Sequence, residues 1–325
     1  MKLISPNQKV VVFGSSGMVG SSILRMLRMH GYKRIFSPLR KDLNLLDNFE
    51  VKNWFDNHNP DIVILAAAKV GGIFANNEYP ADFIMQNIKI QTNVIETSFE
   101  KKIKKFLFLG SSCIYPKFSS QPIKEEELLN GYLEPTNQWY AIAKIAGIKL
   151  CEALNKQYKF NCISLMPTNL YGPGDNYDSL NGHVIPSLIK RILEAKLNNQ
   201  ENLFCWGTGR PLREFLHVDD LASACLFALE NWDINDDSAP KYNDGEKISF
   251  LNVGTGKDIS IYDLSNLIAN IIGYEGKILW DKSKPDGTPK KQLDTSRINK
   301  MGWYPKIDLK DGLIDTINKF KMQYK

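Results

Sequence analysis

Two residues spaced four apart, Tyr140 and Lys144, could carry out acid–base chemistry on a carbonyl group. This spacing places both side chains on one face of a helix. A tyrosine hydroxyl has an ordinary pKa near ~10, and a neighbouring lysine cation or a positively charged nicotinamide can lower it toward the working pH. Such a tyrosine can donate a proton to the negative charge that develops on a carbonyl oxygen during hydride reduction.

Ser111 is the third candidate of this group, because it directly follows the predicted strand Lys105–Gly110. In a doubly wound sheet the carboxyl ends of the strands border the ligand crevice. We therefore expect Ser111 and Tyr140 to converge on one carbonyl oxygen, with Ser111 supplying a second hydrogen bond. Lys144 could also hold the ribose of a nicotinamide cofactor.

A glycine-rich segment favours a dinucleotide site. It lies between the predicted strand Lys9–Phe13 and the predicted helix Gly17–His30, and it reads Gly14, Ser15, Ser16, Gly17, Met18, Val19, Gly20. The first glycine permits a sharp turn, the second lets the backbone approach a pyrophosphate, and the third allows the helix to pack close to the strand. Free N–H groups at the positive end of the helix then bind the anion. An ordinary glycine-rich turn is the alternative, but the strand before it and the helix after it favour the dinucleotide site.

The second predicted strand is Arg34–Ser37, and the loop that follows it indicates whether the chain binds NAD or NADP. An NAD enzyme usually carries an acidic residue there for the ribose 2′-hydroxyl. This chain carries Arg40 and Lys41 instead, and an arginine can bind a 2′-phosphate through two hydrogen bonds. The expected cofactor is therefore NADP in its reduced form, NADPH. Asp42 follows closely, so a charged surface loop is the alternative, and the choice between Arg40 and Lys41 stays open.

Strands and helices alternate through the first half of the chain. Further strands are predicted at Asp61–Leu65 and Asn161–Pro167, and helices at Asp47–His58, Pro80–Lys101 and Trp139–Tyr158, with Asp47 as a helix cap. Alternation of this kind implies parallel βαβ units, and the short apolar strands fit a sheet covered on both faces. The predicted fold is α/β, a Rossmann-type doubly wound parallel sheet.

After Tyr171 the pattern loosens into a smaller α/β region. The predicted helices there are His183–Lys196 and Asp219–Glu230, with Asp219 and Asp220 expected to cap the second. Phe250–Val253 is a predicted strand, and the polar segments Asp175–Gly182, Asn231–Glu246 and Lys282–Lys291 are predicted loops. We expect an NADP-binding domain over residues 1–170, with returning segments near 214–231 and 249–255, and a substrate-binding domain over residues 171–325.

The bulk composition excludes several classes of protein. The 325 residues carry 41 basic and 36 acidic side chains, a net charge of +5, which is too balanced to indicate nucleic-acid binding. The five cysteines form no CxxC pair, so neither a zinc site nor a disulfide framework is expected. No apolar run approaches the ~20 residues that span a bilayer, and no signal peptide is evident. These features predict a cytoplasmic protein without a metal or a membrane partner.

The chain resembles the extended short-chain dehydrogenase/reductase superfamily and, within it, the GDP-L-fucose synthase family. The resemblance runs from about Lys9 to Pro305. Seven motifs carry it in order: Gly17-Met18-Val19-Gly20, Leu43-Asn44-Leu45-Leu46-Asp47, Ala67-Ala68-Lys69-Val70-Gly71-Gly72, Gly110-Ser111-Ser112-Cys113-Ile114-Tyr115-Pro116, Pro167-Thr168-Asn169-Leu170-Tyr171-Gly172-Pro173, Arg213-Glu214-Phe215-Leu216-His217-Val218-Asp219-Asp220 and Pro285-Asp286-Gly287-Thr288-Pro289-Lys290-Lys291.

The resemblance implies a two-stage reaction. That family epimerises GDP-4-keto-6-deoxy-D-mannose at C3 and C5 and then reduces C4 with NADPH. Ser111, Tyr140 and Lys144 would form the reductase triad, and Cys113 and His183 would form the acid/base pair for epimerisation. The resemblance also implies a homodimer, formed through the two long helices Pro80–Lys101 and Trp139–Tyr158.

The remaining site residues also follow from the resemblance. The residues expected near the cofactor, in addition to those already named, are Leu109, Gly110, Ser112, Pro167, Thr168, Asn169, Leu170 and His183. The residues expected to line the GDP-sugar pocket are Arg191, Trp206, Arg213, Asp286 and Lys291.

A physical argument supports the proton-transfer pair. Inversion at a carbon needs proton removal on one face and delivery on the other, and a thiol and an imidazole both have accessible pKa values. Taken alone, Cys113 could be a small core residue and His183 a helix-start residue. His30, His58, His217 and the other four cysteines are interpreted as structural.

Three other kinds of enzyme and one kind of non-enzyme compete with this interpretation. A 4,6-dehydratase typically has Asp-Glu after the triad hydroxyl, where this chain has Ser112 and Cys113. A 4-epimerase needs no thiol–imidazole pair and keeps NAD, which Arg40 and Lys41 disfavour. A related GDP-keto-sugar 4-reductase, for example one acting on a heptose, stays open because pocket shape decides it. A dinucleotide-binding sensor would leave the joint presence of Ser111, Tyr140 and Lys144 unexplained.

Overall fold

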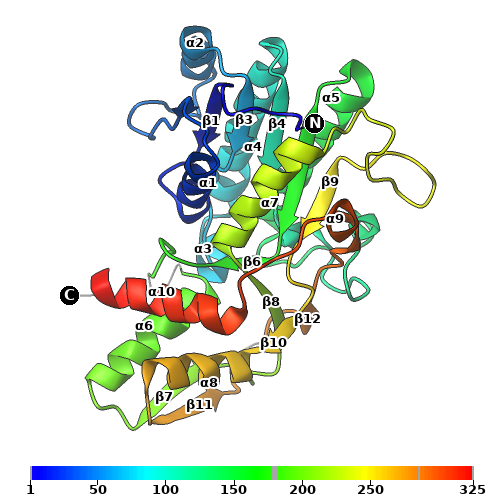
Figure 1. Ribbon diagram of the computed structural model, residues 1–325. Helices are drawn as coiled ribbons and strands as arrows, with labels where there is room; N and C mark the ends of the chain where they lie inside the picture. The colour runs from blue at the N-terminus through cyan, green and yellow to red at the C-terminus, as the bar shows by residue number, and fades with distance from the viewer. Residues whose placement is uncertain (1, 178–181, 285, 324–325) are drawn as a thin grey trace.

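The computed structural model describes residues 2–177, 182–284 and 286–323. Six parallel strands form its central sheet in the order β2-β1-β3-β4-β5-β9 (Figure 1). Their bounds are β1 Val10–Phe13, β2 Ile35–Phe36, β3 Ile62–Leu65, β4 Lys105–Leu109, β5 Cys162–Pro167 and β9 Phe250–Val253. The predicted α/β doubly wound fold is confirmed.

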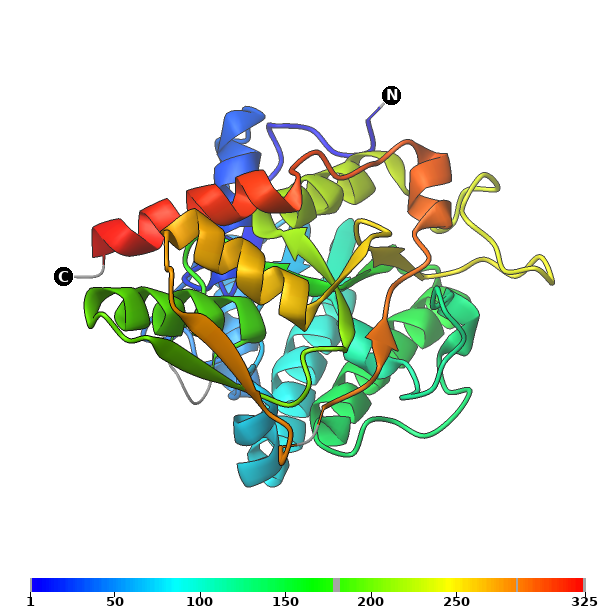
Figure 2. The ribbon, with the colours of Figure 1, turned by 90° about the horizontal axis from the view of Figure 1, so that it is seen from below.

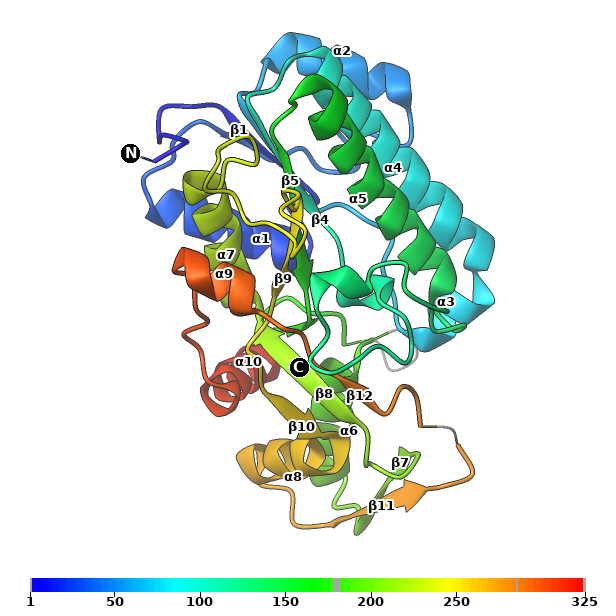
Figure 3. The ribbon, with the colours of Figure 1, turned by 90° about the vertical axis from the view of Figure 1, so that its right-hand side faces the viewer.

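Helices cover both faces of this sheet (Figure 3). One face carries α1 and α7, and the other carries α4 and α5, with α2 packed on α4. Their bounds are α1 Met18–Met29, α2 Asn48–His58, α4 Pro80–Glu100, α5 Gln138–Tyr158 and α7 Val218–Asn231. The strand sequences VVVF and IVIL are fully buried because both of their faces meet helices.

Local capping explains where two of these helices begin. The Asp47 side chain accepts hydrogen bonds from the backbone N–H groups of Phe49 and Glu50, as predicted for the start of α2. The prediction that Asp219 and Asp220 cap α7 is wrong. His217 is the cap, and its Nδ1 accepts from the Asp219 N–H at 3.2 Å.

The two aspartates after His217 tie α7 to other parts of the chain instead. Asp219 forms an ion pair with Arg25 on α1, at 2.6 Å. Asp220 accepts hydrogen bonds from the backbone N–H groups of Lys306 and Ile307, at 3.0 and 2.9 Å. These distant partners could not be read from the local sequence.

A second layer lies below the carboxyl edge of the central sheet and has its own apolar core. Figure 2 shows α10 and α6 on either side of α8 in this layer. Its helices are α6 Val184–Leu197, α8 Ile261–Ile272 and α10 Leu309–Gln323. Its strands are β6 Asn169–Tyr171, β7 Asn202–Trp206, β8 Leu212–His217, β10 Asp258–Ser260, β11 Lys277–Asp281 and β12 Lys290–Lys291.

Several of these elements were not predicted. The segment Lys282–Lys291, predicted as a loop, ends in β12, which pairs parallel with β8. No sequence pattern predicted the short elements α3 Ile73–Glu78, η1 Ser112–Ile114, η2 Glu125–Glu127 and α9 Ser296–Met301. Strands of two or three residues form only because a distant partner strand is present, so they leave little periodic signal. Of the polar segment Asp175–Gly182, residues 178–181 lie outside the described residues.

None of the helices in the described ranges combines the length and hydropathy that a bilayer crossing requires. Across the same residues, no group of three or more metal-binding side chains is found. All five cysteines are free and buried.

Candidate active site

A cavity of about 1500 Å³ lies between the carboxyl edge of the central sheet and the second layer. Residues that follow β1, β3, β4 and β5 line its upper wall, and residues of α6, β8 and β12 line its lower wall. The sheet changes direction of winding between β1 and β3, which is where ligands bind in doubly wound folds.

The glycine-rich turn forms one end of this cavity. Gly14 has φ +86°, and a Cβ added there would lie 2.6 Å from the backbone nitrogen of Ala67. A Cβ on Gly20 would lie 2.1 Å from the carbonyl oxygen of Gly14, so α1 packs against the turn only because glycine occupies position 20. Both predicted roles, the sharp turn and the close helix packing, agree with this geometry.

The first turn of α1 suits an anion. Gly17 is the N-cap, no side chain caps the helix, and no acidic residue occupies its first turn. The free N–H groups and the positive helix end therefore face the cavity unneutralised. This cradle fits the pyrophosphate of a dinucleotide.

The structure separates the basic residues that were considered for the 2′-phosphate. Arg40 lines the cavity, whereas Lys41 is absent from its lining and is exposed. Ser15, also expected beside the cofactor, does not line the cavity either, because its hydroxyl donates to the Ser37 carbonyl at 3.3 Å. All the other residues expected near the cofactor line the cavity.

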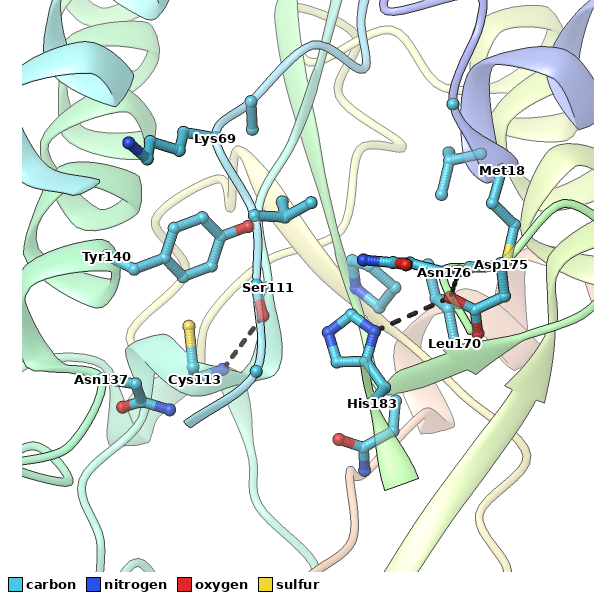
Figure 4. Close-up of a pocket in the computed structure, with 18 of the residues that line it drawn as sticks. Met18, Lys69, Ser111, Cys113, Asn137, Tyr140, Leu170, Asp175, Asn176 and His183 are labelled. Carbon is cyan, nitrogen blue, oxygen red and sulfur yellow. Dashed lines mark hydrogen bonds and ion pairs between the residues drawn. The ribbon is translucent and has the colours of Figure 1, made fainter. Parts of the chain in front are cut away.

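Ser111, Cys113 and Tyr140 meet on one side of the cavity (Figure 4). Ser111 caps the short helix η1, and its Oγ accepts a hydrogen bond from the Cys113 N–H at 3.4 Å. Tyr140 lies in the first turn of α5, and its ring makes an edge contact with Phe83 of α4, with centroids 6.4 Å apart. Ser111 and Tyr140 thus line the same side of one cavity.

Lys144 lies one turn further along α5 and is buried. Its Nζ donates to the Leu109 carbonyl oxygen at 2.7 Å and lies 4.7 Å from the centroid of the Phe108 ring. Burial lowers the pKa of Lys144 to about 8.

The pKa of Tyr140 differs from the expectation. The sequence predicted a value lowered by Lys144 together with the positively charged nicotinamide, but in the protein itself burial, with a smaller contribution from Cys113, raises the pKa of Tyr140 above its usual range. The Lys144 amine lies 5.7 Å from the Tyr140 ring centroid and donates its hydrogen bond to the Leu109 carbonyl. Burial is therefore the main cause of the pKa shift of Tyr140. Tyr140 therefore holds its proton at neutral pH.

Cys113 and Lys291 influence each other across the cavity. Burial raises the pKa of the Cys113 thiol, and the nearby Lys291 ammonium opposes this by favouring the thiolate. Burial also lowers the pKa of Lys291, whereas the interaction with Cys113 raises it by a smaller amount. Cys113, although buried, lines the cavity.

His183 lies across the cavity from the Ser111, Cys113 and Tyr140 group (Figure 4). Its backbone is the N-cap of α6, but its side chain makes no cap hydrogen bond and is 51% exposed. Its Nδ1 lies 3.9 Å from Oδ1 of Asp175. The imidazole is therefore directed into the cavity and not toward its own helix.

The five residues expected in the GDP-sugar pocket all line the cavity. Trp206, 72% exposed, presents its ring at the end of β7. Asp286 accepts hydrogen bonds from the Thr208 N–H and hydroxyl, at 2.7 and 2.6 Å, and Arg191 donates to the Phe204 carbonyl. These contacts hold the polar groups in place at the far end of the cavity from the glycine turn.

Among the further residues that line the cavity and had no predicted role are Lys69, Glu134, Asn137 and Asp175. Lys69 could have been found, because it follows β3 and the carboxyl ends of strands border the crevice. Asn137 could also have been found, since it precedes Tyr140 by less than one helical turn. Glu134 and Asp175 come from loops whose path the sequence pattern does not predict.

Comparisons with known proteins agree with this geometry. Residues 10–243 match the model of the NAD dependent epimerase/dehydratase family. The chain is 51% identical to GDP-L-fucose synthase 1 of Arabidopsis thaliana, covering 95% of this chain and 91% of the relative. It is 50% identical to GDP-L-fucose synthase of Escherichia coli, covering 96% of each.

A solved structure shows the same fold. GDP-mannoheptose C4 reductase from Campylobacter jejuni with NADP bound has a TM-score of 0.88 and 34% identity, over 98% of this chain and 99% of that one. The resemblance to the GDP-L-fucose synthases, stated from sequence motifs, is confirmed over nearly the whole chain. The chain belongs to the NAD dependent epimerase/dehydratase family.

Proposed function

We propose that this protein converts GDP-4-keto-6-deoxy-D-mannose to GDP-L-fucose, by epimerisation at C3 and C5 followed by NADPH-dependent reduction at C4. One observation carries the proposal. A hydroxyl pair suited to a carbonyl oxygen, Ser111 and Tyr140, shares a single cavity with a thiol–imidazole pair suited to proton transfer, Cys113 and His183. The relatives of about 50% identity, which are named GDP-L-fucose synthases, support it.

The two stages can use one oxygen-binding site. C3 and C5 both flank the C4 ketone, so their protons become acidic when the ketone oxygen is stabilised as an enolate. Ser111 and Tyr140 would stabilise that enolate and later the alkoxide that develops at the same oxygen. Cys113 and His183, on opposite sides of the cavity, would remove and deliver protons on opposite faces of the sugar.

Tyr140 is suited to complete the reduction. Because its pKa is raised by burial, its hydroxyl keeps the proton at neutral pH and can give it to the developing alkoxide. Lys144 is held by Leu109 beside the ring and would contact the cofactor ribose. Ser111 would donate the second hydrogen bond.

NADPH would be held by the glycine turn, by the residues that follow β4 and β5, and by Arg40. When bound, NADPH supplies the hydride for C4. The uncapped N-terminus of α1 fits its pyrophosphate, and Arg40 fits its 2′-phosphate. The Campylobacter structure with NADP bound supports this cofactor.

The GDP portion would bind at the opposite end. Arg191, Arg213 and Lys291 supply positive charge for a diphosphate, and exposed Trp206 offers a face for the base. The sugar would then extend toward Ser111, Tyr140 and His183. We assign the second layer, residues 171–325, to substrate binding and residues 1–170, with the segments near 214–231 and 249–255, to NADP binding. Two separate apolar cores support a division into two parts, although Leu293, Ile298 and Trp303 pack in the first core and not in the second.

The decisive experiment supplies purified protein with NADPH and GDP-4-keto-6-deoxy-mannose. Oxidation of NADPH is followed by absorbance, and the product sugar is identified by NMR. GDP-L-fucose as the product would support the proposal. Absence of NADPH oxidation with every GDP-4-keto sugar tried would favour a non-catalytic dinucleotide-binding protein.

A second candidate is a GDP-keto-sugar 4-reductase that acts on a heptose. The resemblance to a GDP-mannoheptose C4 reductase, at 34% identity, supports it. The same NMR assay with a GDP-4-keto-heptose separates the two. Faster turnover of the heptose, with C3 and C5 unchanged in the product, would favour this second function.

We further propose a homodimer formed through α4 and α5, and a location in the cytoplasm. The two helices pack side by side on one outer face of the protein (Figure 3), and they leave Met85, Ile88, Trp139 and Ile142 exposed. Five free cysteines suit a reducing compartment. Light scattering on the purified protein and on a Met85→Lys/Ile142→Lys variant tests the dimer, which the double substitution is expected to dissociate.

A further inference from the structure

The carboxylate of Asp175 is buried without a complete set of partners. Its side chain is only 5% exposed. Oδ1 accepts from the Asn176 N–H at 2.8 Å, whereas Oδ2 is buried and has no hydrogen-bond partner within the described ranges. A buried carboxylate oxygen without a donor is costly, so such a group indicates an interaction that the site completes.

His183 is an ionisable donor close to this carboxylate. Its Nδ1 lies 3.9 Å from Oδ1 of Asp175, and no lysine or arginine of the described residues lies within ion-pair distance of that carboxylate. Gly172 at φ +149° and Gly174 at φ +85° turn the chain between β6 and Asp175. The buried carboxylate and the imidazole at the start of α6 thus come from segments only eight residues apart.

The orientation of the imidazole makes the contact useful. In Figure 4 the ring stands between Asp175 on one side and the Ser111 and Cys113 side of the cavity on the other. Nδ1 faces the carboxylate, so Nε2 is the nitrogen left for chemistry in the cavity. Since the His183 side chain makes no cap hydrogen bond with α6, nothing in its own helix competes for Nδ1.

We propose that Asp175 is a positioning residue that accepts a hydrogen bond from the Nδ1–H of His183 and so directs Nε2 toward the substrate carbon. This inference rests on the proposed proton-transfer role of His183. The 3.9 Å separation exceeds a hydrogen bond, so the proposal requires the imidazole to move closer to the carboxylate when substrate binds. Such contacts are often long without substrate and tighten in the complex.

The proton transfer balances in both directions. When His183 acts as base, the Nε2 lone pair takes the carbon-bound proton, and the C–H electron pair becomes the C=C bond of the enolate. When it acts as acid, the Nε2–H proton passes to the enolate carbon, and the C=O bond re-forms. In both cases Nδ1 keeps its proton, and Asp175 stabilises the imidazolium without being protonated itself.

The kinetic test isolates proton exchange from reduction. The substrate is incubated in heavy water with NADP⁺ in place of NADPH, and deuterium uptake at C3 and C5 is followed by NMR. Asp175→Asn is expected to slow uptake by about tenfold or more, while NADPH binding stays unchanged. The double variant Asp175→Asn/His183→Asn is expected to be no slower than His183→Asn alone, because both changes remove the same function.

Tyr177 offers a matched control. It lies near the same carboxylate, since Asp175 contributes to the raised pKa of its hydroxyl, and its ring stacks on Phe320 at 3.9 Å. Tyr177→Phe keeps that stacking and is expected to leave deuterium uptake unchanged. A loss in Tyr177→Phe equal to that in Asp175→Asn, or fully additive losses in the double variant, would overturn the proposal.

A spectroscopic test does not depend on turnover. In protein labelled with ¹⁵N-histidine, His183 is identified among the four histidines by its absence from His183→Asn. The neutral ring is expected in the Nδ1–H tautomer, and Asp175→Asn is expected to shift it toward Nε2–H. The Nε2–H tautomer in the unmodified protein would refute the positioning role even with full activity. Lack of turnover with the expected tautomer would instead refute only the proposed function.

Discussion

Lys144 donates a 2.7 Å hydrogen bond to the backbone carbonyl oxygen of Leu109, the last residue of β4. The contact joins α5 to the carboxyl end of the sheet. It places a buried amine, whose pKa burial lowers to about 8, beside the Tyr140 ring. The position of the Lys144 amine is thus set by a hydrogen bond between a side chain of α5 and a backbone carbonyl of β4.

This burial predicts a pH dependence of stability. Between the folded pKa of about 8 and the ordinary value of 10.5, the unfolded state binds more protons at Lys144 than the folded state. The free energy of unfolding should therefore gain on the order of 2 kcal/mol from Lys144 as pH rises through this window, and the gain should be absent below it. Denaturant unfolding of wild type and Lys144→Met at pH 7.5 and 10 measures the difference.

Lys149 provides the control for this measurement. It lies on the same helix, and its amine forms an ion pair with Glu152 at the surface. Lys149→Met is expected to show the wild-type pH trend. If Lys144→Met and wild type change equally between the two pH values, Lys144 is not a buried titrating group.

Tyr140→Phe is expected to lower C4 reduction by about 10²- to 10⁴-fold, because the variant lacks the proton donor. The edge contact with Phe83 survives, so the ring position and NADPH binding should be unchanged. Single-turnover NADPH oxidation and a fluorescence titration of NADPH measure the two properties. Reduction at the wild-type rate would exclude Tyr140 as the donor.

Cys113→Ser is expected to stop epimerisation and leave the cavity intact. A serine hydroxyl is close in size to the thiol but far less acidic, so it cannot accept or deliver the proton at a useful rate. Loss of deuterium uptake at C3 or C5 from heavy water is the readout. Uptake at the wild-type rate would remove Cys113 from the mechanism, whatever happens to reduction.

Cofactor preference should depend on Arg40 and not on Lys41. Arg40 lines the cavity and Lys41 does not. Arg40→Met is expected to weaken NADPH binding by about 10- to 100-fold, because the variant loses a hydrogen bond to a charged phosphate. NADH lacks that phosphate, so its binding should change little. Lys41→Met is the matched control and should bind both cofactors as wild type does. The reverse pattern would assign the 2′-phosphate to Lys41.

Local patterns determined the core of the fold. Apolar runs such as Asp61–Leu65, the glycines at 14 and 20, and the cap at Asp47 each act within a few residues, so their structural consequences are readable from the chain. The spacing of Tyr140 and Lys144 is likewise a local property of one helix. Family motifs then indicated which distant residues belong to the same site.

Only the tertiary structure decided how distant segments meet. His183 faces Ser111 and Cys113 because the second layer folds under the sheet edge, and the carboxylate of Asp175 is buried beside it. Asp219 binds Arg25 in place of capping its helix, and burial, with a smaller contribution from Cys113, raises the pKa of Tyr140. Burial and long-range contacts depend on the packed whole, and for that reason no local pattern in the sequence encodes them.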